Sequence, residues 1–161
     1  MTEALAVRNA TLADDGAIAR LSGMLGYPVE VRVVRERLER LLRRADAAVL
    51  VAERPGTGVV AWLHAAVLEM LESDRRCEIL GLVVDAEHRR TGAGRRLVEA
   101  AEHWAREQGL DQAGVRSNVA RAESHPFYER LGYTRAKTQH AYRKRLSPLP
   151  TSPPANPSTA P

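Results

Sequence analysis

The sequence predicts a single domain of the α/β class. Its 161 residues, 44% of them hydrophobic and 27% charged, have the length and composition of one ordinary globular domain. The spacing of apolar residues changes several times along the chain between the strand period of two and the helix period of about 3.6. In chain order these segments predict a strand, two helices, three strands, a helix, a strand, a helix and a last strand.

A short strand and two helices begin the chain. Apolar residues that alternate with polar ones at 5–7 are typical of a strand. Thr11 and Asp14 have the spacing of a capping box, which predicts a helix that reaches about Met24. A stripe of apolar side chains over 30–45 predicts a second, amphipathic helix.

Three strands are expected next. The apolar runs at 47–53 and 59–68 flank a Pro-Gly-Thr-Gly turn, which predicts a hairpin. After a polar connection at 72–76, the apolar run at 77–84 predicts a buried central strand. Gly81 inside this strand indicates a bulge or the close approach of another backbone.

The second half of the domain begins with a long helix. Its apolar face extends to about Gln108, and Gly109 is well placed as its C-cap. A strand at 113–118, a short helix at 121–131 and an extended segment at 133–146 are expected to follow.

The end of the chain differs in composition from the rest. Residues 147–161 contain six of the nine prolines and no charged side chain, so they can neither complete a hydrogen-bonded ladder nor bury a core. We expect a domain of residues 1–146 followed by a disordered tail.

Cysteine usage and hydropathy exclude several classes of protein. Cys77 is the only cysteine, so no intrachain disulfide can form, and we expect it in the core rather than as a nucleophile. No apolar run approaches the roughly 18 residues of a membrane span, and the N-terminus lacks the pattern of a secretory leader. These features predict a cytoplasmic protein with no membrane segment and no bound metal.

A glycine loop between the strand at 77–84 and the following helix is the most specific chemical signal. Residues 91–94, Thr-Gly-Ala-Gly, stand at a helix N-terminus, where free N–H groups and a partial positive charge favour phosphate. The loop matches neither a Walker A loop nor a dinucleotide-binding loop. It predicts a polyphosphate site, with the alternative that its glycines only shape the helix start. Four arginines flank the loop and add charge-assisted donors: Arg89, Arg90, Arg95 and Arg96.

Two motifs are similar to those of one enzyme family. Arg89-Arg90-Thr91-Gly92-Ala93-Gly94 follows the apolar strand, and Phe127-Tyr128-Glu129-Arg130-Leu131-Gly132-Tyr133 follows the next strand. In this order they resemble the pyrophosphate and aromatic motifs of the GNAT superfamily of acetyl-CoA-dependent N-acetyltransferases. The resemblance covers roughly residues 5–146. It implies a mixed central sheet of about six to seven strands, flanked by four helices and splayed between the two central parallel strands.

The resemblance implies acetyl-CoA as the cosubstrate. Its pantetheine arm would pair with the backbone of residues 82–84, whose N–H groups would polarise the thioester carbonyl. Asn118 lies farther from Tyr128 than the asparagine of the family pattern, so Ser124 takes its place among the expected contacts. The residues expected to bind the cofactor are Leu82, Val83, Val84, Arg89, Arg90, Thr91, Gly92, Ala93, Gly94, Arg95, Ser124, Phe127 and Tyr128.

The resemblance also implies direct transfer of acetyl to a primary amine in a ternary complex, with two proton-transfer residues. Tyr128 is expected to be the general acid, with packing beside Phe127 as its alternative role. Glu78, at the start of the central strand, is expected to be the general base, and Glu69 is the competing carboxylate. His64 stands alone in an apolar strand and is interpreted as a hydrogen-bonded core residue.

Some alternatives stay open. The net charge of −2 over residues 51–80 favours a cationic acceptor, which can be a small amine, an antibiotic or a peptide amine. A non-catalytic acyl-CoA-binding sensor or interaction module is the alternative function. Residues 115–146 carry a net charge of +6, but their aromatic residues already belong to the motif, so nucleic-acid binding ranks last. Family members are often dimers, so a homodimer is an alternative to a monomer.

Overall fold

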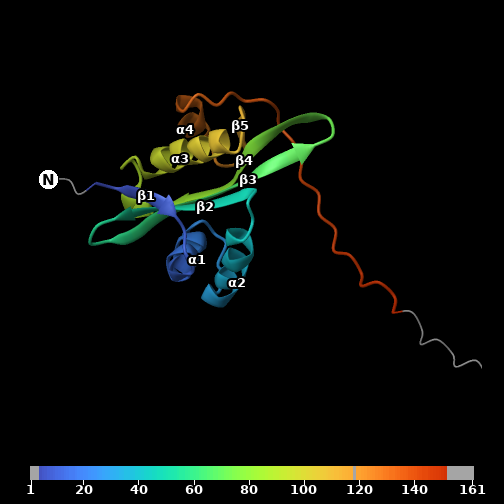
Figure 1. Ribbon diagram of the computed structural model, residues 1–161, viewed down its shortest axis with the longest axis horizontal. Helices are drawn as coiled ribbons and strands as arrows, with labels where there is room; N and C mark the ends of the chain where they lie inside the picture. Colours follow the sequence, from blue (N-terminus) through green and yellow to red (C-terminus); the bar gives the residue numbers. More distant parts are fainter. Residues whose placement is uncertain (1–3, 118, 152–161) are drawn as a thin grey trace, which may run out of the picture.

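The computed structural model is a mixed sheet with helices on both faces (Figure 1). The structure describes residues 4–117 and 119–151. The five strands of these residues lie in the order β1-β2-β3-β4-β5. Neighbours among the first four pair antiparallel, whereas β4 and β5 are parallel. The α/β class and the four α-helices are confirmed.

The elements follow the predicted order up to the last helix. A 3₁₀ turn at Leu12–Asp14 precedes the first helix, and another at Ala86–His88 follows the fourth strand. The bounds are β1 (Ala6–Asn9), α1 (Asp15–Met24), α2 (Val31–Leu42), β2 (Ala47–Arg54), β3 (Gly58–Met70), β4 (Ser73–Val84), α3 (Ala93–Glu107), β5 (Ala113–Val115) and α4 (Ser124–Arg130).

The start of α1 shows how the capping signal is used. The Asp14 carboxylate accepts a hydrogen bond from the backbone N–H of Thr11 at 2.8 Å, a contact that a capping box predicts. It also accepts two hydrogen bonds from the Arg8 guanidinium, at 2.8 and 2.9 Å. The bonds from Arg8 lower the pKa of Asp14, so this buried carboxylate stays charged. The capped segment is a 3₁₀ turn, and the α-helix begins after it, at Asp15.

Two apolar cores hold the helices against the sheet. Leu50 of β2 belongs to the core beneath α3, together with Leu63 and Leu97. Val49 and Val51 of the same strand belong to a second core, with α1 and α2. Because side chains alternate across a strand, one apolar run serves both layers, which is typical of a strand that is covered on both faces.

The end of α3 lies close to the prediction, with Gln108 as the C-cap and Gly109 directly after it. Gly109 has a φ of +75°, in the left-handed region that glycine tolerates. The N–H of Leu110 donates to the carbonyl of Ala105 at 2.9 Å, which closes the last turn.

β4 is longer than predicted. Residues 72–76 were expected to be a connection, but Ser73–Arg76 continue the antiparallel pairing with β3. The side chains at 73–75 are exposed, because this end of the hairpin projects beyond the helices (Figure 1). Polar residues are tolerated in the strand there, since neither face has to be buried.

A β-bulge interrupts β4 near its middle. The register with β3 shifts between His64 and Ala65, which leaves Leu80 as the extra residue. The bulge predicted from Gly81 is therefore confirmed. The close approach comes from a side chain rather than a backbone, since a Cβ at Gly81 would lie 2.8 Å from the Trp62 ring.

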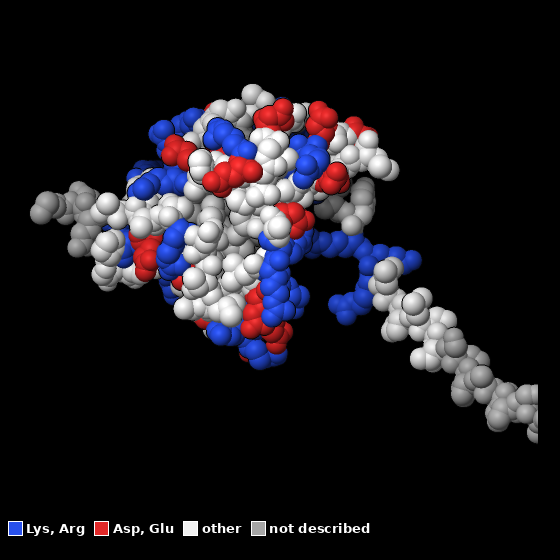
Figure 2. Space-filling model, in the orientation of Figure 1, with Lys and Arg blue, Asp and Glu red and all other residues white. Residues whose placement is uncertain are grey.

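The last predicted strand does not form. Residues 134–151 are exposed and contain neither helix nor strand, so six to seven strands are not confirmed in the described part of the chain. This segment has no alternating apolar face for a sheet to bury, and basic side chains gather where it leaves the domain (Figure 2). Most of the predicted tail, residues 152–161, lies outside the described residues.

Two further findings concern residues 4–117 and 119–151. None of their helices is both long enough and apolar enough to cross a membrane. They also contain no group of three or more His, Cys, Asp or Glu residues that could hold a metal ion. The cytoplasmic location stays a prediction.

Candidate active site

β4 and β5 separate after a short stretch of pairing. The parallel register runs from Cys77 opposite Ala113 to Ile79 opposite Val115. Beyond Ile79, this edge of β4 has no partner strand within the described residues, although β4 continues to Val84. Backbone N–H and C=O groups require partners when they leave water, so this edge can pair with an extended ligand.

A small cavity of about 210 Å³ lies at this separation. Its wall includes Ile79 and Leu82 of β4, Val115 of β5, and Ser124 and Tyr128 of α4. Three of the residues expected to bind the cofactor, Leu82, Ser124 and Tyr128, are therefore brought together. Asn118 lies outside the described residues.

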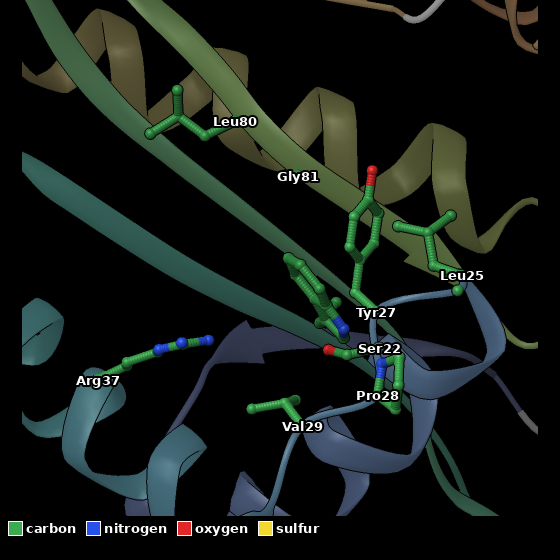
Figure 3. Close-up of a pocket in the computed structure, with 10 residues that line it drawn as sticks. Ser22, Leu25, Tyr27, Pro28, Val29, Arg37, Leu80 and Gly81 are labelled. Atoms are coloured by element: carbon green, nitrogen blue, oxygen red, sulfur yellow. The ribbon is translucent and has the colours of Figure 1, made fainter. Parts of the chain in front are cut away.

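A larger cavity of about 670 Å³ adjoins the first (Figure 3). Its wall is formed by the loop after α1, by Arg37 of α2 and by the bulged part of the sheet. Leu25, Tyr27, Leu80 and Gly81 line both cavities. The two spaces thus meet at the bulge of β4.

Tyr128 has features of both roles expected for it. Its ring packs edge to face against Phe127 and Tyr133, with ring centres 5.0 and 5.9 Å away. The same residue lines the small cavity. Burial raises the pKa of its hydroxyl, and the charge of Arg121 opposes that shift only in part. The hydroxyl keeps its proton at neutral pH, as a proton donor must.

The glycine loop has a backbone shape that favours glycine. Gly92 caps the N-terminus of α3 with a φ of +86°. Gly94 permits close packing, because a Cβ there would lie 3.2 Å from the Phe127 ring. Both glycines therefore help to shape the helix start, as the alternative interpretation proposed. The same geometry leaves the first N–H groups of α3 next to a segment in which Arg89 and Arg90 are exposed.

The two arginines that follow the loop are engaged within the protein. Arg95 donates to the Glu99 carboxylate at 2.8 Å, and Arg96 donates to the backbone carbonyl of Leu5. Arg89 and Arg90, which precede the loop, form no side-chain hydrogen bond or ion pair with any described residue. Their guanidinium groups are therefore available to a phosphate.

The remaining residues expected to bind the cofactor surround the loop or the end of β4. Val83 and Val84 pack into the two opposite cores, and Ala93 is buried at the start of α3. Thr91 is exposed, and its hydroxyl donates to the carbonyl of His88 at 2.6 Å. None of these residues lines the small cavity, and the side chains of Val83 and Val84 face the two cores instead.

Glu78 is buried between two arginines. Its Oε2 lies 3.0 Å from Nε of Arg76, and its Oε1 lies 3.3 Å from Nε of Arg116. A Cβ at Gly114 would lie 2.8 Å from Oε2, so β5 also encloses the carboxylate. Glu78 lines neither cavity, and its role as the base stays a prediction. The competing Glu69 is exposed on the hairpin.

His64 lies half-buried in β3, opposite Gly81. Burial, and to a lesser extent the charge of Arg44, lowers its pKa, so the imidazole is neutral at pH 7. It belongs to neither of the two apolar cores, so the interpretation as a hydrogen-bonded core residue is not confirmed. Its buried Nε2 has no hydrogen-bond partner in the described part of the chain.

Cys77 is fully buried, as expected for a core residue, and burial raises the pKa of its thiol to about 11. The ordinary thiol pKa is near 9.0, so at pH 8 the folded chain should hold about a hundredfold less thiolate than the unfolded chain. We therefore expect an aromatic disulfide reagent to label the folded protein at least that much more slowly than the protein in denaturant. Labelling is followed by absorbance, and equal rates for the folded and the denatured protein would contradict the burial of Cys77.

Sequence reasoning missed the residues that line the larger cavity. Tyr27, Arg37 and Trp62 belong to no motif, yet all three contribute to its wall. A signal existed for Tyr27, because it lies in the Gly-Tyr-Pro break between two predicted helices, and loops often carry functional side chains. Arg37 is one of several arginines on its helix, and Trp62 lies in an apolar strand, so nothing in the sequence singles them out.

Comparison with solved structures finds the same fold in N-acetyltransferases. The aminoglycoside 6′-N-acetyltransferase AAC(6′)-Ih from Acinetobacter baumannii aligns with a TM-score of 0.79 and 19% identity, over 89% of this chain and 100% of that chain. AAC(6′)-Iy, solved in complex with the bisubstrate analogue CoA-S-monomethyl-acetylneamine, aligns with a TM-score of 0.78 and 17% identity, over 89% and 99%. At these identities the likeness shows the fold.

Sequence comparison then shows the family. The model of the acetyltransferase (GNAT) family matches residues 19–133, so the chain belongs to this family. The uncharacterized N-acetyltransferase YhdJ of Bacillus subtilis (strain 168) is 27% identical over 107 residues, which cover 66% of this chain and 75% of that protein. The resemblance inferred from the two motifs is confirmed.

Proposed function

We propose that the protein transfers an acetyl group from acetyl-CoA to a primary amine, directly within a ternary complex. One observation carries the proposal: the edge of β4 loses its partner strand beside Tyr128, where the small cavity meets the larger one. A strand-like thioester arm fits the first space, and an amine fits the second. The complex of AAC(6′)-Iy with a CoA-containing analogue supports CoA as the cosubstrate.

Two features of the chain suit the two ends of acetyl-CoA. The amides of the pantetheine arm can pair with the unpartnered backbone edge of residues 82–84. The pyrophosphate requires N–H donors and positive charge, which the start of α3 at Gly92 and the exposed Arg89 and Arg90 supply. We assign further contacts to Thr91, Ala93, Gly94, Ser124 and Phe127, and to the backbone N–H of Arg95, whose side chain pairs with Glu99.

Acetyl transfer requires two proton movements, and we assign one residue to each. The amine gives up a proton and attacks the thioester carbonyl carbon, and the departing sulfur takes up a proton. Tyr128 lines the small cavity, and its hydroxyl keeps its proton at neutral pH, so we assign it as the acid. We assign Glu78 as the base, acting through a water molecule because its carboxylate lines neither cavity.

A non-catalytic acyl-CoA-binding module is the second candidate function. It would use the same glycine loop and the same unpartnered edge, but it would need no proton donor. Packing against Phe127 and Tyr133 requires only a ring, and phenylalanine would serve it equally well. The presence of a hydroxyl at residue 128 therefore favours the enzyme.

The test is the release of CoA from acetyl-CoA in the presence of a panel of primary amines. We expect release that depends on both substrates, and a melting temperature that rises with CoA. At a hundred times the Kd the added stability should be about 2.7 kcal/mol. If neither CoA nor acetyl-CoA raised the melting temperature, the cosubstrate assignment would be wrong. Stabilisation without turnover of any amine would favour the sensor.

A further inference from the structure

The larger cavity, in which we place the acceptor, carries charge of one sign. Among the described residues that line it, Arg37 is the only charged one. We propose that the acceptor is an amine with an apolar or aromatic body that also carries an anionic group, in the simplest case a carboxylate. This inference rests on the proposed acetyl transfer and specifies its acceptor.

Arg37 is free to bind such a group. Its exposed guanidinium has no hydrogen bond or ion pair with any described residue, whereas Arg32 and Arg35 of the same helix each pair with a carboxylate. Figure 3 shows the Arg37 side chain extending from α2 into the cavity, on the side opposite Leu25 and Tyr27. A planar guanidinium at a cavity wall can bind a carboxylate through two parallel hydrogen bonds.

The rest of the wall suits an apolar body. Leu25, Tyr27 and Val29 contribute side chains from the loop after α1, and the Trp62 ring lies against the bulge at Gly81. Aromatic and aliphatic side chains make most of their contact energy with rings and hydrocarbon. They offer few partners to the many hydroxyl and ammonium groups of an aminoglycoside.

Nearby carboxylates do not reverse the charge of the site. Glu78 is buried between two arginines, and no other carboxylate of residues 51–80 lines either cavity. The net charge of that segment therefore does not describe the cavity wall. The small cavity adds Arg116 and Arg121 to its described lining and no acidic residue. A polycationic acceptor would meet arginines without a carboxylate to bind it.

The test compares three aromatic amines that differ in their carboxylate. 2-Phenylethylamine has none, phenylalanine has one beside the amine, and 4-(2-aminoethyl)benzoate has one across the ring. We expect at least one carboxylate amine to have a kcat/KM about tenfold or more above that of 2-phenylethylamine, the factor that a charge-assisted hydrogen bond can supply. Arg37→Gln should remove this advantage, chiefly through KM, so that neither carboxylate amine is acetylated faster than 2-phenylethylamine by the same variant.

A matched control removes the same charge outside the cavity. Arg43 caps the C-terminal end of the same helix and lines neither cavity, so Arg43→Gln should change none of the three rates. Equal or better acetylation of 2-phenylethylamine, of glucosamine 6-phosphate or of the aminoglycoside neamine, compared with the best carboxylate amine, would overturn the inference.

A binding measurement separates this inference from the proposed reaction. 3-Phenylpropionate has the ring and the carboxylate but no amine, so it should raise the melting temperature of the wild type and not that of Arg37→Gln. If it does so while no amine is acetylated, the anion site stands and the proposed transfer fails. If it binds both proteins equally, or neither, the assignment of Arg37 is wrong even where acetylation is observed.

Discussion

Replacing Tyr128 with phenylalanine should lower kcat for acetyl transfer by about a hundredfold, which is the lower end of what a positioned general acid contributes. The substitution removes the hydroxyl of a residue that lines the small cavity and keeps the ring that packs against Phe127 and Tyr133. The affinity for CoA should change little. Initial rates of CoA release measure the first effect, and a calorimetric titration with CoA measures the second.

Tyr133→Phe is the matched control for this prediction. Tyr133 belongs to the same aromatic cluster, but its hydroxyl donates to the Glu102 carboxylate at 3.0 Å and does not line the small cavity. We expect this variant to lose about 1 kcal/mol of stability and to retain its kcat. The same loss of kcat in both variants would contradict Tyr128 as the acid.

The pH dependence of kcat tests the same assignment without a substitution. Burial raises the pKa of Tyr128 above its ordinary value of 10.0, so the proton-donating form is present through the neutral range and is lost only in strong alkali. We expect kcat to rise above neutral pH as the amine or its base loses a proton, and to stay high to about pH 9 or beyond. A fall between about pH 7 and 9 would point to a different acid.

Replacing Gly92 with alanine should weaken CoA binding by about tenfold or more. An alanine at a φ of +86° costs about 1 kcal/mol, and since nothing lies within 4 Å of a Cβ there, the cost is conformational rather than steric. A loop that relaxes away from this φ redirects the first N–H groups of α3, and a helix N-terminus binds phosphate through the direction of those groups. Titration with CoA measures the change.

Gly109→Ala makes the same change at the other end of the same helix. Its φ of +75° and the open space around it match those of Gly92, so it should cost a similar amount of stability. It lies far along the chain from the glycine loop, and CoA affinity should not change. If both variants bound CoA as the wild type does, the glycine loop would not be the phosphate site.

Much of the fold could be predicted from sequence, because the relevant signals are local. Gly109 ends α3 through a single backbone angle, and the apolar run of β2 indicates a strand covered on both faces. The prediction of the last strand was wrong, because strand formation depends on a distant neighbour rather than on a local signal. A strand requires a neighbour that buries one of its faces, and the basic, exposed residues 134–146 have no such face.

Half of the candidate site could likewise be predicted. The glycine loop and the aromatic motif are short and contiguous, so their residue types alone indicate a backbone angle at Gly92 and a ring cluster around Tyr128. The partners of Glu78 could not be predicted, because Arg116 reaches it only through the parallel pairing of β5 with β4. Charge summed along residues 51–80 does not describe the cavity wall, since none of those carboxylates lines either cavity.

The sequence by itself determined the α/β class, the order of elements as far as α4 and the family, because each depends on residues that are neighbours in the chain. Only the tertiary structure decided where β4 leaves β5, and that Arg37, Tyr27 and Trp62 line one cavity beside the bulge. These side chains come from a helix, a loop and a strand that meet only when two apolar cores pack on opposite faces of the sheet. Packing between distant segments, rather than any local pattern, therefore sets the charge and shape of the cavity in which we place the acceptor.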